Sequence, residues 1–158
     1  MNYLDRAQDD LETALLLLSP VGNPTQDVGK FDIAAYHIQQ SMEKGLKHIL
    51  HDICGISDEE RSFRTHNLPY LIRWAESVSD YRVSNELKAV AVDVTGWEAK
   101  SRYSSSAVST QAEIMEAANC CSEFLENIQK TCKGNELEIP MEEQEKHKEL
   151  LERQENSN

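Results

Sequence analysis

Phe31 to Cys54 reads FDIAAYHIQQSMEKGLKHILHDIC, the longest uninterrupted periodic stretch of the chain. At about 100° per residue, its apolar side chains gather on one side of a helix and its polar side chains on the other. The apolar side comprises Phe31, Ala34, Ala35, Ile38, Met42, Gly45, Leu46, Ile49, Leu50 and Ile53. The other side, which we call the polar stripe, comprises His37, Gln40, Ser41, Lys44, Lys47, His48 and His51. The stretch therefore predicts an amphipathic helix whose apolar side is a core face.

The rest of the chain carries four further helical patterns, and nothing in it reads as a strand. The five predicted helices are Tyr3–Leu18, Phe31–Cys54, a third from a Thr65 cap to Val78, a fourth from Val83 past Trp97 to Ser101, and a fifth from Thr110 to Lys133. Gly55 is expected to end the second helix, and Gly134 the fifth. Thr110 and Glu113 predict a capping box. We therefore predict an all-α fold, an up-and-down antiparallel bundle of about five helices.

The length and composition fit one small domain. The chain has 158 residues, enough to bury a core without disulfides or metal. We predict a helical bundle over 1–133 and a charged C-terminal tail over 134–158, either a short helix or disordered. The net charge of -12 argues against non-specific coating of duplex nucleic acid, which needs a broad cationic surface.

Cysteine usage and hydropathy indicate the compartment. The four cysteines form no C-x-x-C pair, and the first residues are polar rather than a secretory leader. No apolar run approaches the roughly 20 residues that a membrane span needs. We expect a cytoplasmic protein with reduced thiols and no membrane association. The helical pattern places Cys121 and Cys132 in the core, with Cys120 nearer its edge.

The second helix resembles the signature helix of the HEPN family (higher eukaryotes and prokaryotes nucleotide-binding domains). The matching positions are Ala34, Ala35, Tyr36, His37, Gln39, Gln40, Glu43, Lys44, Leu46 and Lys47. Two shorter landmarks follow in the family's order. Thr65-His66-Asn67-Leu68 stands where the family has Thr-His-Asp-Leu, and Arg102-Tyr103-Ser104 stands where it has Arg-Tyr-Pro. The resemblance covers about residues 1 to 132.

This resemblance implies a helical bundle that forms a homodimer. Members are often encoded beside a minimal nucleotidyltransferase, in arrangements like toxin–antitoxin pairs. Many are metal-independent ribonucleases that use an Arg-x4-6-His motif on a late helix. Here Arg102 is followed by no histidine before His147, so the catalytic histidine is missing from its expected place. Arg61-SFRT-His66 has the spacing, but it lies in the connector before the third helix and reads as a chance match.

The polar stripe supports three interpretations. It can be a solvated helix face with Glu43 and Lys47 paired at i,i+4, a contact for an acidic partner or a second copy, or a site for nucleotide or RNA. The candidate ligand-binding residues are His37, Gln40, Lys44, Lys47, Arg102 and Tyr103. For Arg102, the alternative to phosphate binding is an ion pair with Glu98, one turn back.

Catalytic and metal sites are predicted weakly. Arg102 and His66 are the catalytic candidates, although a histidine such as His66 is more often a capping or hydrogen-bonded residue than a general base. His48, His51 and Cys54 share one helix at spacings of three, which rarely converges on one ion, so we predict no metal site and no cofactor.

The sequence thus favours a non-catalytic HEPN-type binding module. Its expected ligand is a nucleotide or RNA, or its partner is a minimal nucleotidyltransferase in a toxin–antitoxin-like system. The alternative is a metal-independent ribonuclease, a toxin, that combines Arg102 with a non-standard histidine such as His37 or His66. The missing histidine after Arg102 favours the non-catalytic class.

Overall fold

A computed structural model describes residues 1–19, 28–103 and 108–138, with backbone alone for 28–29, 101–103 and 132–138. All regular structure in these ranges is helical. The elements are α1 Tyr3–Leu18, α2 Val28–Lys47, the π-helix η1 His48–Ile53, the 3-10 helix η2 Arg61–Arg64, α3 Leu68–Val78, α4 Asn85–Val94, α5 Trp97–Tyr103 and α6 Gln111–Glu138. The chain divides into two units, Met1–Glu126 and Asn127–Asn158, and the packing described below is that of the first. The predicted all-α helical bundle is confirmed.

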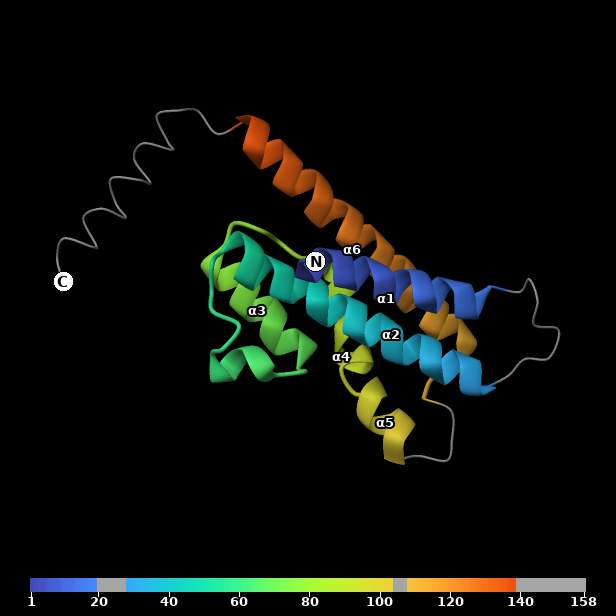
Figure 1. Ribbon diagram of the computed structural model, residues 1–158. Helices are drawn as coiled ribbons and strands as arrows, with labels where there is room; N and C mark the ends of the chain where they lie inside the picture. Colours follow the sequence, from blue (N-terminus) through green and yellow to red (C-terminus); the bar gives the residue numbers. More distant parts are fainter. Residues whose placement is uncertain (20–27, 104–107, 139–158) are drawn as a thin grey trace. The chain divides into compact units, whose positions relative to one another are not determined.

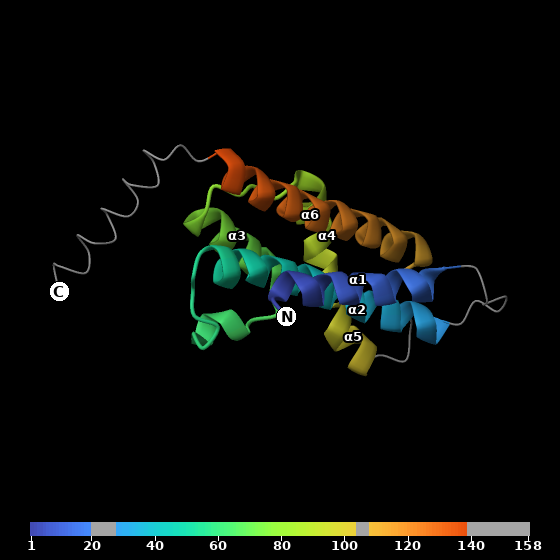
Figure 2. The same ribbon diagram turned by 45° about the horizontal axis from the view of Figure 1, so that its top comes forward.

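Helices α1 and α2 are antiparallel and lie side by side (Figures 1 and 2). Asn2 begins α1 with a capping box, because its side chain accepts the Asp5 N–H while the Asp5 carboxylate accepts the Asn2 N–H. The predicted bounds of α1 are confirmed. Ala7 and Ala14 are fully buried, which lets the two helices approach closely. The Ser41 hydroxyl donates to the Ala7 carbonyl oxygen at 2.7 Å, so part of the polar stripe lies inside the α1–α2 contact.

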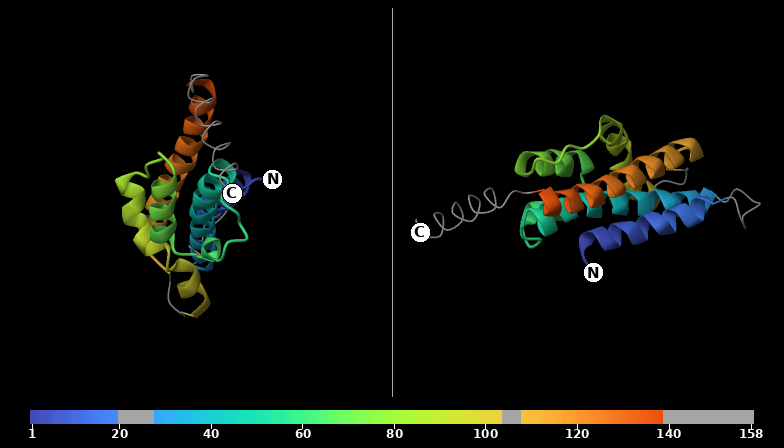
Figure 3. Two further views of the ribbon diagram at one scale, coloured as in Figure 1. Left: turned by 90° about the vertical axis from the view of Figure 1, so that its left-hand side faces the viewer. Right: turned by 90° about the horizontal axis from the view of Figure 1, so that it is seen from above.

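Helix α2 also packs against α6, beside its contact with α1 (Figure 3). The core face is confirmed for Ala34, Ala35, Ile38, Met42, Leu46, Ile49 and Leu50, all of which are at most 1% exposed. Gly45 marks the closest approach, because a Cβ there would lie 2.6 Å from Cε1 of Phe124 and 2.9 Å from Cδ2 of Leu125. A side chain at this position would collide with α6.

The end of the second predicted helix departs from the α pattern. From His48 to Ile53 the chain is a π-helix, with a hydrogen bond from the Cys54 N–H to the Ile49 carbonyl oxygen at 3.0 Å. Bonding across five residues shifts the side-chain register. Ile53 therefore leaves the core face and is 49% exposed, which contradicts its predicted burial. Gly55, at φ +73°, ends the helix as predicted.

Helix α3 begins at a different cap from the one predicted. The Asn67 side chain, rather than that of Thr65, accepts the Tyr70 N–H at 3.0 Å and is the N-cap. Asparagine is at least as good a cap as threonine, and Pro69 fits in the first turn without losing a bond. The Thr65 hydroxyl instead accepts the Asn67 N–H at 3.2 Å. The predicted helix is correct, and its predicted cap is wrong.

The predicted fourth helix is two helices, α4 and α5, separated at Thr95 and Gly96. The buried side chain of Gln39 bridges the break. Its amide group donates to the Thr95 carbonyl oxygen at 3.2 Å and accepts the Glu98 N–H at 2.7 Å. The Thr95 hydroxyl accepts the Leu68 N–H and donates to the His66 carbonyl oxygen. The Gln39 side chain satisfies two backbone groups that the break frees, and the Thr95 hydroxyl joins the break to the start of α3.

Helix α6 begins at the predicted cap, Thr110, with one of the two hydrogen bonds of the predicted capping box, and it extends further than predicted. The Thr110 hydroxyl accepts the Glu113 N–H at 3.2 Å, and the Glu113 carboxylate accepts a hydrogen bond from the Ser109 hydroxyl. The helical backbone continues through Gly134 to Glu138, so the predicted end at Lys133-Gly134 is wrong. A single glycine inside a helix costs only about 1 kcal/mol, which is too little to end it. Residues 139–158 of the predicted tail lie outside the described residues.

Candidate functional site

Asp10 of α1 faces two residues of the polar stripe, His37 and Lys44. Its carboxylate lies 2.8 Å from Nδ1 of His37 and accepts a hydrogen bond from the Lys44 ammonium. The side chains of Asp10, His37 and Lys44 are 13%, 25% and 28% exposed. The Lys44 charge is therefore compensated within the α1–α2 contact, and a ligand phosphate would have to compete with this carboxylate.

Glu43 holds a second cluster on α2. Its buried carboxylate lies 2.7 Å from Nζ of Lys47 and 3.0 Å from Nδ1 of His66. Nζ of Lys47 also lies over the Phe63 ring, 5.3 Å from its centroid. The i,i+4 pair of Glu43 and Lys47 that the sequence predicts is present. It is buried, however, and it does not lie on a solvated face.

His66 is held at two points. Its side chain contacts Glu43, and its carbonyl oxygen accepts the Thr95 hydroxyl proton at 3.0 Å. The His66 side chain is nevertheless 63% exposed. With Nδ1 on the carboxylate, the other ring nitrogen is left for solvent or a ligand. This geometry fits the hydrogen-bonded histidine that the sequence favours over a general base.

The remaining histidines of the stripe have their own partners. Nδ1 of His48 lies 2.8 Å from the Asp52 carboxylate, and Nδ1 of His51 lies 2.6 Å from the Ile56 carbonyl oxygen. The Cys54 thiol lies 3.9 Å from the Val78 carbonyl oxygen. In the described part of the chain, no group of three or more His, Cys, Asp or Glu could hold a metal ion. Gln40 is half-buried on α2.

Cys120 and Cys121, whose side chains are described, differ in burial as predicted. Cys121 is fully buried and lies 3.3 Å from the Ser41 hydroxyl, whereas Cys120 is half-buried. Burial raises the pKa of the Cys121 thiol to about 12. Partial burial also raises the pKa of the Cys54 and Cys120 thiols. The side chain of Cys132 lies outside the described part of the structure.

Arg102 and Tyr103 are the last two residues of α5, and their side chains lie outside the described part. The ion pair of Arg102 with Glu98 that the sequence offers as an alternative is therefore untested. The same helix carries Trp97 and Lys100, whose side chains are described. These two residues line a pocket together with residues of α4 and of the segment that begins α6.

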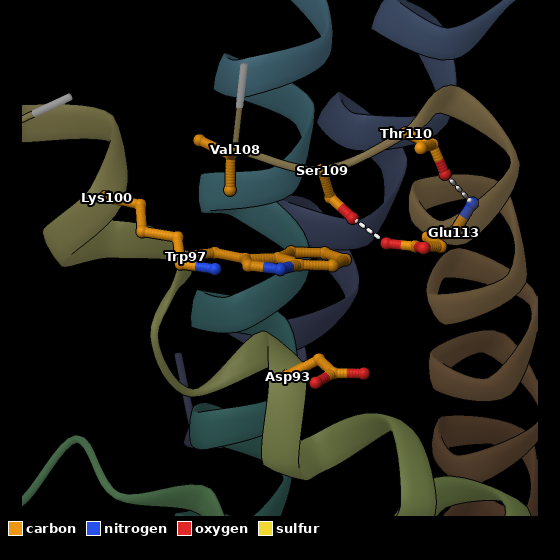
Figure 4. Close-up of a pocket in the computed structure, with 7 residues that line it drawn as sticks. All are labelled: Asp93, Trp97, Lys100, Val108, Ser109, Thr110 and Glu113. Carbon is orange, nitrogen blue, oxygen red and sulfur yellow. Dashed lines mark hydrogen bonds between the residues drawn. The ribbon is translucent and has the colours of Figure 1, made fainter. Parts of the chain in front are cut away.

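This pocket, which we call the α5–α6 pocket, has a volume of about 520 Å³ (Figure 4). It is lined by Asp93, Trp97, Lys100, Val108, Ser109, Thr110 and Glu113. The Trp97 ring lies between Val108 and Asp93, with Lys100 at its side (Figure 4). The Val108 N–H donates to the Asp32 carboxylate at 3.0 Å, which ties the segment before α6 to α2. The pocket thus combines an aromatic wall, hydroxyls, two carboxylates and an exposed ammonium.

Sequence reasoning missed two features, the carboxylate of Asp10 and the α5–α6 pocket. Asp10 lies beside the apolar face of α1, between Ala7 and Ala14, and a charged residue at that margin is a signal for a buried partner. The sequence contains no comparable signal for the pocket. Its residues come from α4, α5 and the start of α6, and no periodic pattern joins them. Of the predicted ligand-binding residues, His37 and Lys44 lie together at Asp10, while Lys47 lies in the Glu43 cluster.

Comparison with known proteins gives one match. A family model described as the HEPN domain matches residues 1–131. No curated protein and no solved structure matches the chain. Among the described residues, no helix is both long and apolar enough to cross a membrane.

Proposed function

Because the chain belongs to the HEPN domain family, we propose that it is a HEPN-type binding module that takes a nucleotide in the α5–α6 pocket. The observation that carries this proposal is the pocket itself, about 520 Å³ in volume and lined by Trp97 and Lys100. Pockets for small ligands usually measure roughly 300 to 1,000 Å³ and combine apolar walls with a few placed polar groups.

The lining suits the parts of a nucleotide. The exposed Lys100 ammonium supplies a charge for phosphate, and the α5 backbone continues to Arg102 within two residues. The carboxylates of Asp93 and Glu113 accept hydrogen bonds from ribose hydroxyls or from base amino groups. The Trp97 ring, which is 3% exposed, forms a wall rather than an open stacking platform. Arg102 and Tyr103 stay in the proposed ligand set.

We assign the polar stripe a structural role in this proposal. Lys44 and Lys47 each face a carboxylate that is mostly buried, and His37 shares the carboxylate of Asp10. Binding phosphate there would require these ion pairs to break, and a buried carboxylate left without its partner is costly. The stripe residues His37 and Lys44 therefore support α1, and Lys47 supports the start of α3 through Glu43.

The sequence after Arg102 supports a module that binds without cleaving. The family's cleavage motif has its histidine five to seven residues beyond its arginine, and the next histidine here is His147. The competing function is ribonuclease activity that combines Arg102 with His66, whose second ring nitrogen is free to act. Incubation of the purified protein with cellular RNA and EDTA separates the two. We expect no cleavage, whereas cleavage abolished by Arg102→Ala would establish the ribonuclease.

The resemblance supports two further parts of the proposal, a homodimer and a minimal nucleotidyltransferase as partner in a toxin–antitoxin-like pair in the cytoplasm. Light scattering on the purified chain tests the homodimer. We expect a measured mass of twice the monomer mass. Co-expression with a nucleotidyltransferase encoded next to it, where one is present, tests the partner. Separate elution of the two proteins would contradict that pairing.

Calorimetric titration with a panel of ribonucleotides tests the proposed ligand. We expect at least one member to bind, and Lys100→Ala to weaken its binding about tenfold, because a phosphate would lose a charged hydrogen bond. Lys130→Ala is the matched control, because Lys130 is an exposed lysine outside the pocket. Equal affinity in wild type and Lys100→Ala would remove the pocket from the proposal.

A further inference from the structure

We propose that η2 and the exposed face of α3 form a docking surface for an acidic segment of a partner protein. The surface, which we call the arginine face, comprises Arg61, Arg64, Tyr70, Arg73 and Trp74. It lies apart from the α5–α6 pocket, and none of its residues lines that pocket. The proposal rests on unpaired cations, their spacing and the aromatic rings beside them.

Arg61 and Arg64 are positioned as a pair by the 3-10 helix. Three residues complete a turn of η2, so side chains at i and i+3 lie on the same side. Both arginines are exposed, while Phe63 between them is buried and anchors the turn. Arg73 is exposed on α3. Within the part of the chain that the structure describes, none of these three arginines has a carboxylate partner.

Aromatic contacts join η2 to α3. The Phe63 ring packs edge-on against Trp74, with 6.4 Å between centroids, and Tyr70 lies 6.1 Å from Trp74. Tyr70 is 39% exposed, and Trp74 is half-buried. Arginine, tyrosine and tryptophan are the residue types that dominate the binding energy of protein interfaces. Arg73 also lines a groove of about 220 Å³ between α3 and α4, together with Pro69, the buried Ile72 and the ion pair of Glu76 and Lys88.

The positive charge of the arginine face indicates the kind of partner that it binds. The chain carries 28 acidic against 16 basic residues, so a cluster of unpaired arginines is unusual on it. Arginine binds carboxylates through two parallel hydrogen bonds. Asp58, Glu59 and Glu60 immediately precede η2 and confine the cationic surface to the arginines, which is too narrow for the extended backbone of a nucleic acid. A short acidic segment with one apolar side chain fits three arginines beside the aromatic rings of Tyr70 and Trp74.

Fluorescence anisotropy with synthetic peptides tests the arginine face. The probe is a short labelled peptide of alternating Asp and Glu with one central Leu, and its control replaces the acids with Asn and Gln. We expect the acidic peptide to bind the wild-type chain and the amide peptide not to bind. Arg61→Gln combined with Arg64→Gln should weaken binding about tenfold or more.

The control variant combines Lys30→Gln with Lys130→Gln, which removes the same charge at residues outside the arginine face. It should keep the wild-type affinity, and circular dichroism should show that both double variants are folded. No binding of the acidic peptide, or equal weakening in both variants, would overturn the proposal. Tighter, arginine-dependent binding of a labelled RNA would reassign the face to nucleic acid. Loss of self-association in Arg61→Gln/Arg64→Gln would reassign it to a second copy.

Discussion

At the scale of single residues, Gln39 determines more of the fold than its neighbours on α2. Its side chain is 1% exposed. The side-chain amide donates a hydrogen bond to the carbonyl oxygen of Thr95, directly after α4, and accepts one from the N–H of Glu98 in the first turn of α5. Sequence reasoning placed Gln39 only within a family motif. Its role could not be predicted, because the break between α4 and α5 that it bridges is not visible in the apolar spacing of Val83 to Ser101.

Gln39→Ala should lower the free energy of unfolding by about 2 to 4 kcal/mol. The change leaves the Glu98 N–H and the Thr95 carbonyl oxygen without the amide, at roughly 1 to 2 kcal/mol for each of these two part-buried groups. Urea denaturation followed by circular dichroism measures the loss. Gln40→Ala, one residue along the same helix and half-buried, should cost about 1 kcal/mol or less. Equal losses in the two variants would contradict the bridging role.

The cysteines provide a second test at this scale. The raised pKa of Cys121 and its complete burial keep the thiolate, the reactive form, scarce at neutral pH. In the folded protein, iodoacetamide should modify Cys120 before Cys121, as peptide mass spectrometry would show. In denaturant, the two adjacent thiols should react at similar rates. Rapid modification of Cys121 in the native protein would mean that the α2–α6 contact opens.

At the scale of elements, the contacts of α2 with α1 and with α6 both depend on small residues. Ala7 and Ala14 admit α1, and Gly45 admits the first half of α6. The sequence predicted the core face of α2 correctly, because burial follows directly from helical periodicity. It could not indicate which helix covers the polar stripe, since the partner residue Asp10 lies in another element.

Gly45→Ala should destabilise the chain by about 1 to 2 kcal/mol, although alanine favours helices by about 1 kcal/mol over glycine. The new Cβ would meet Phe124 and Leu125 at less than 3 Å, and the two helices would have to separate. Gly96→Ala is the control, because its nearest neighbour would lie at 3.8 Å, an ordinary contact. Thermal unfolding compares them, and a Gly45→Ala variant as stable as Gly96→Ala would contradict the close approach.

Asp10→Asn should lower the free energy of unfolding by about 1 to 2 kcal/mol, because Lys44 and His37 lose their shared, partly buried counter-charge. Asp9→Asn removes the same charge from the adjacent, exposed position and should change stability by about 0.5 kcal/mol or less. Chemical denaturation of both variants checks this. An equal effect of the two substitutions would show that the α1–α2 ion pairs contribute nothing.

At the scale of the whole molecule, the helical class and the position of most helices follow from the sequence. The apolar periodicity of Tyr3–Leu18 and Phe31–Leu50 is strong enough to overcome local ambiguity. The site could not be predicted in the same way. The sequence directs attention to the polar stripe, whose cations face internal carboxylates, whereas the α5–α6 pocket exists only where three segments meet.

The central claim is that a nucleotide binds in the α5–α6 pocket and not on the polar stripe. Amide-resolved NMR of the isotope-labelled chain, titrated with the ribonucleotide that binds in calorimetry, tests it most directly. We predict that the largest shifts occur at Lys100, Ser109, Thr110 and Glu113, with little change at His37 and Lys44. Shifts concentrated at His37 and Lys44, with the pocket residues unmoved, would contradict the claim.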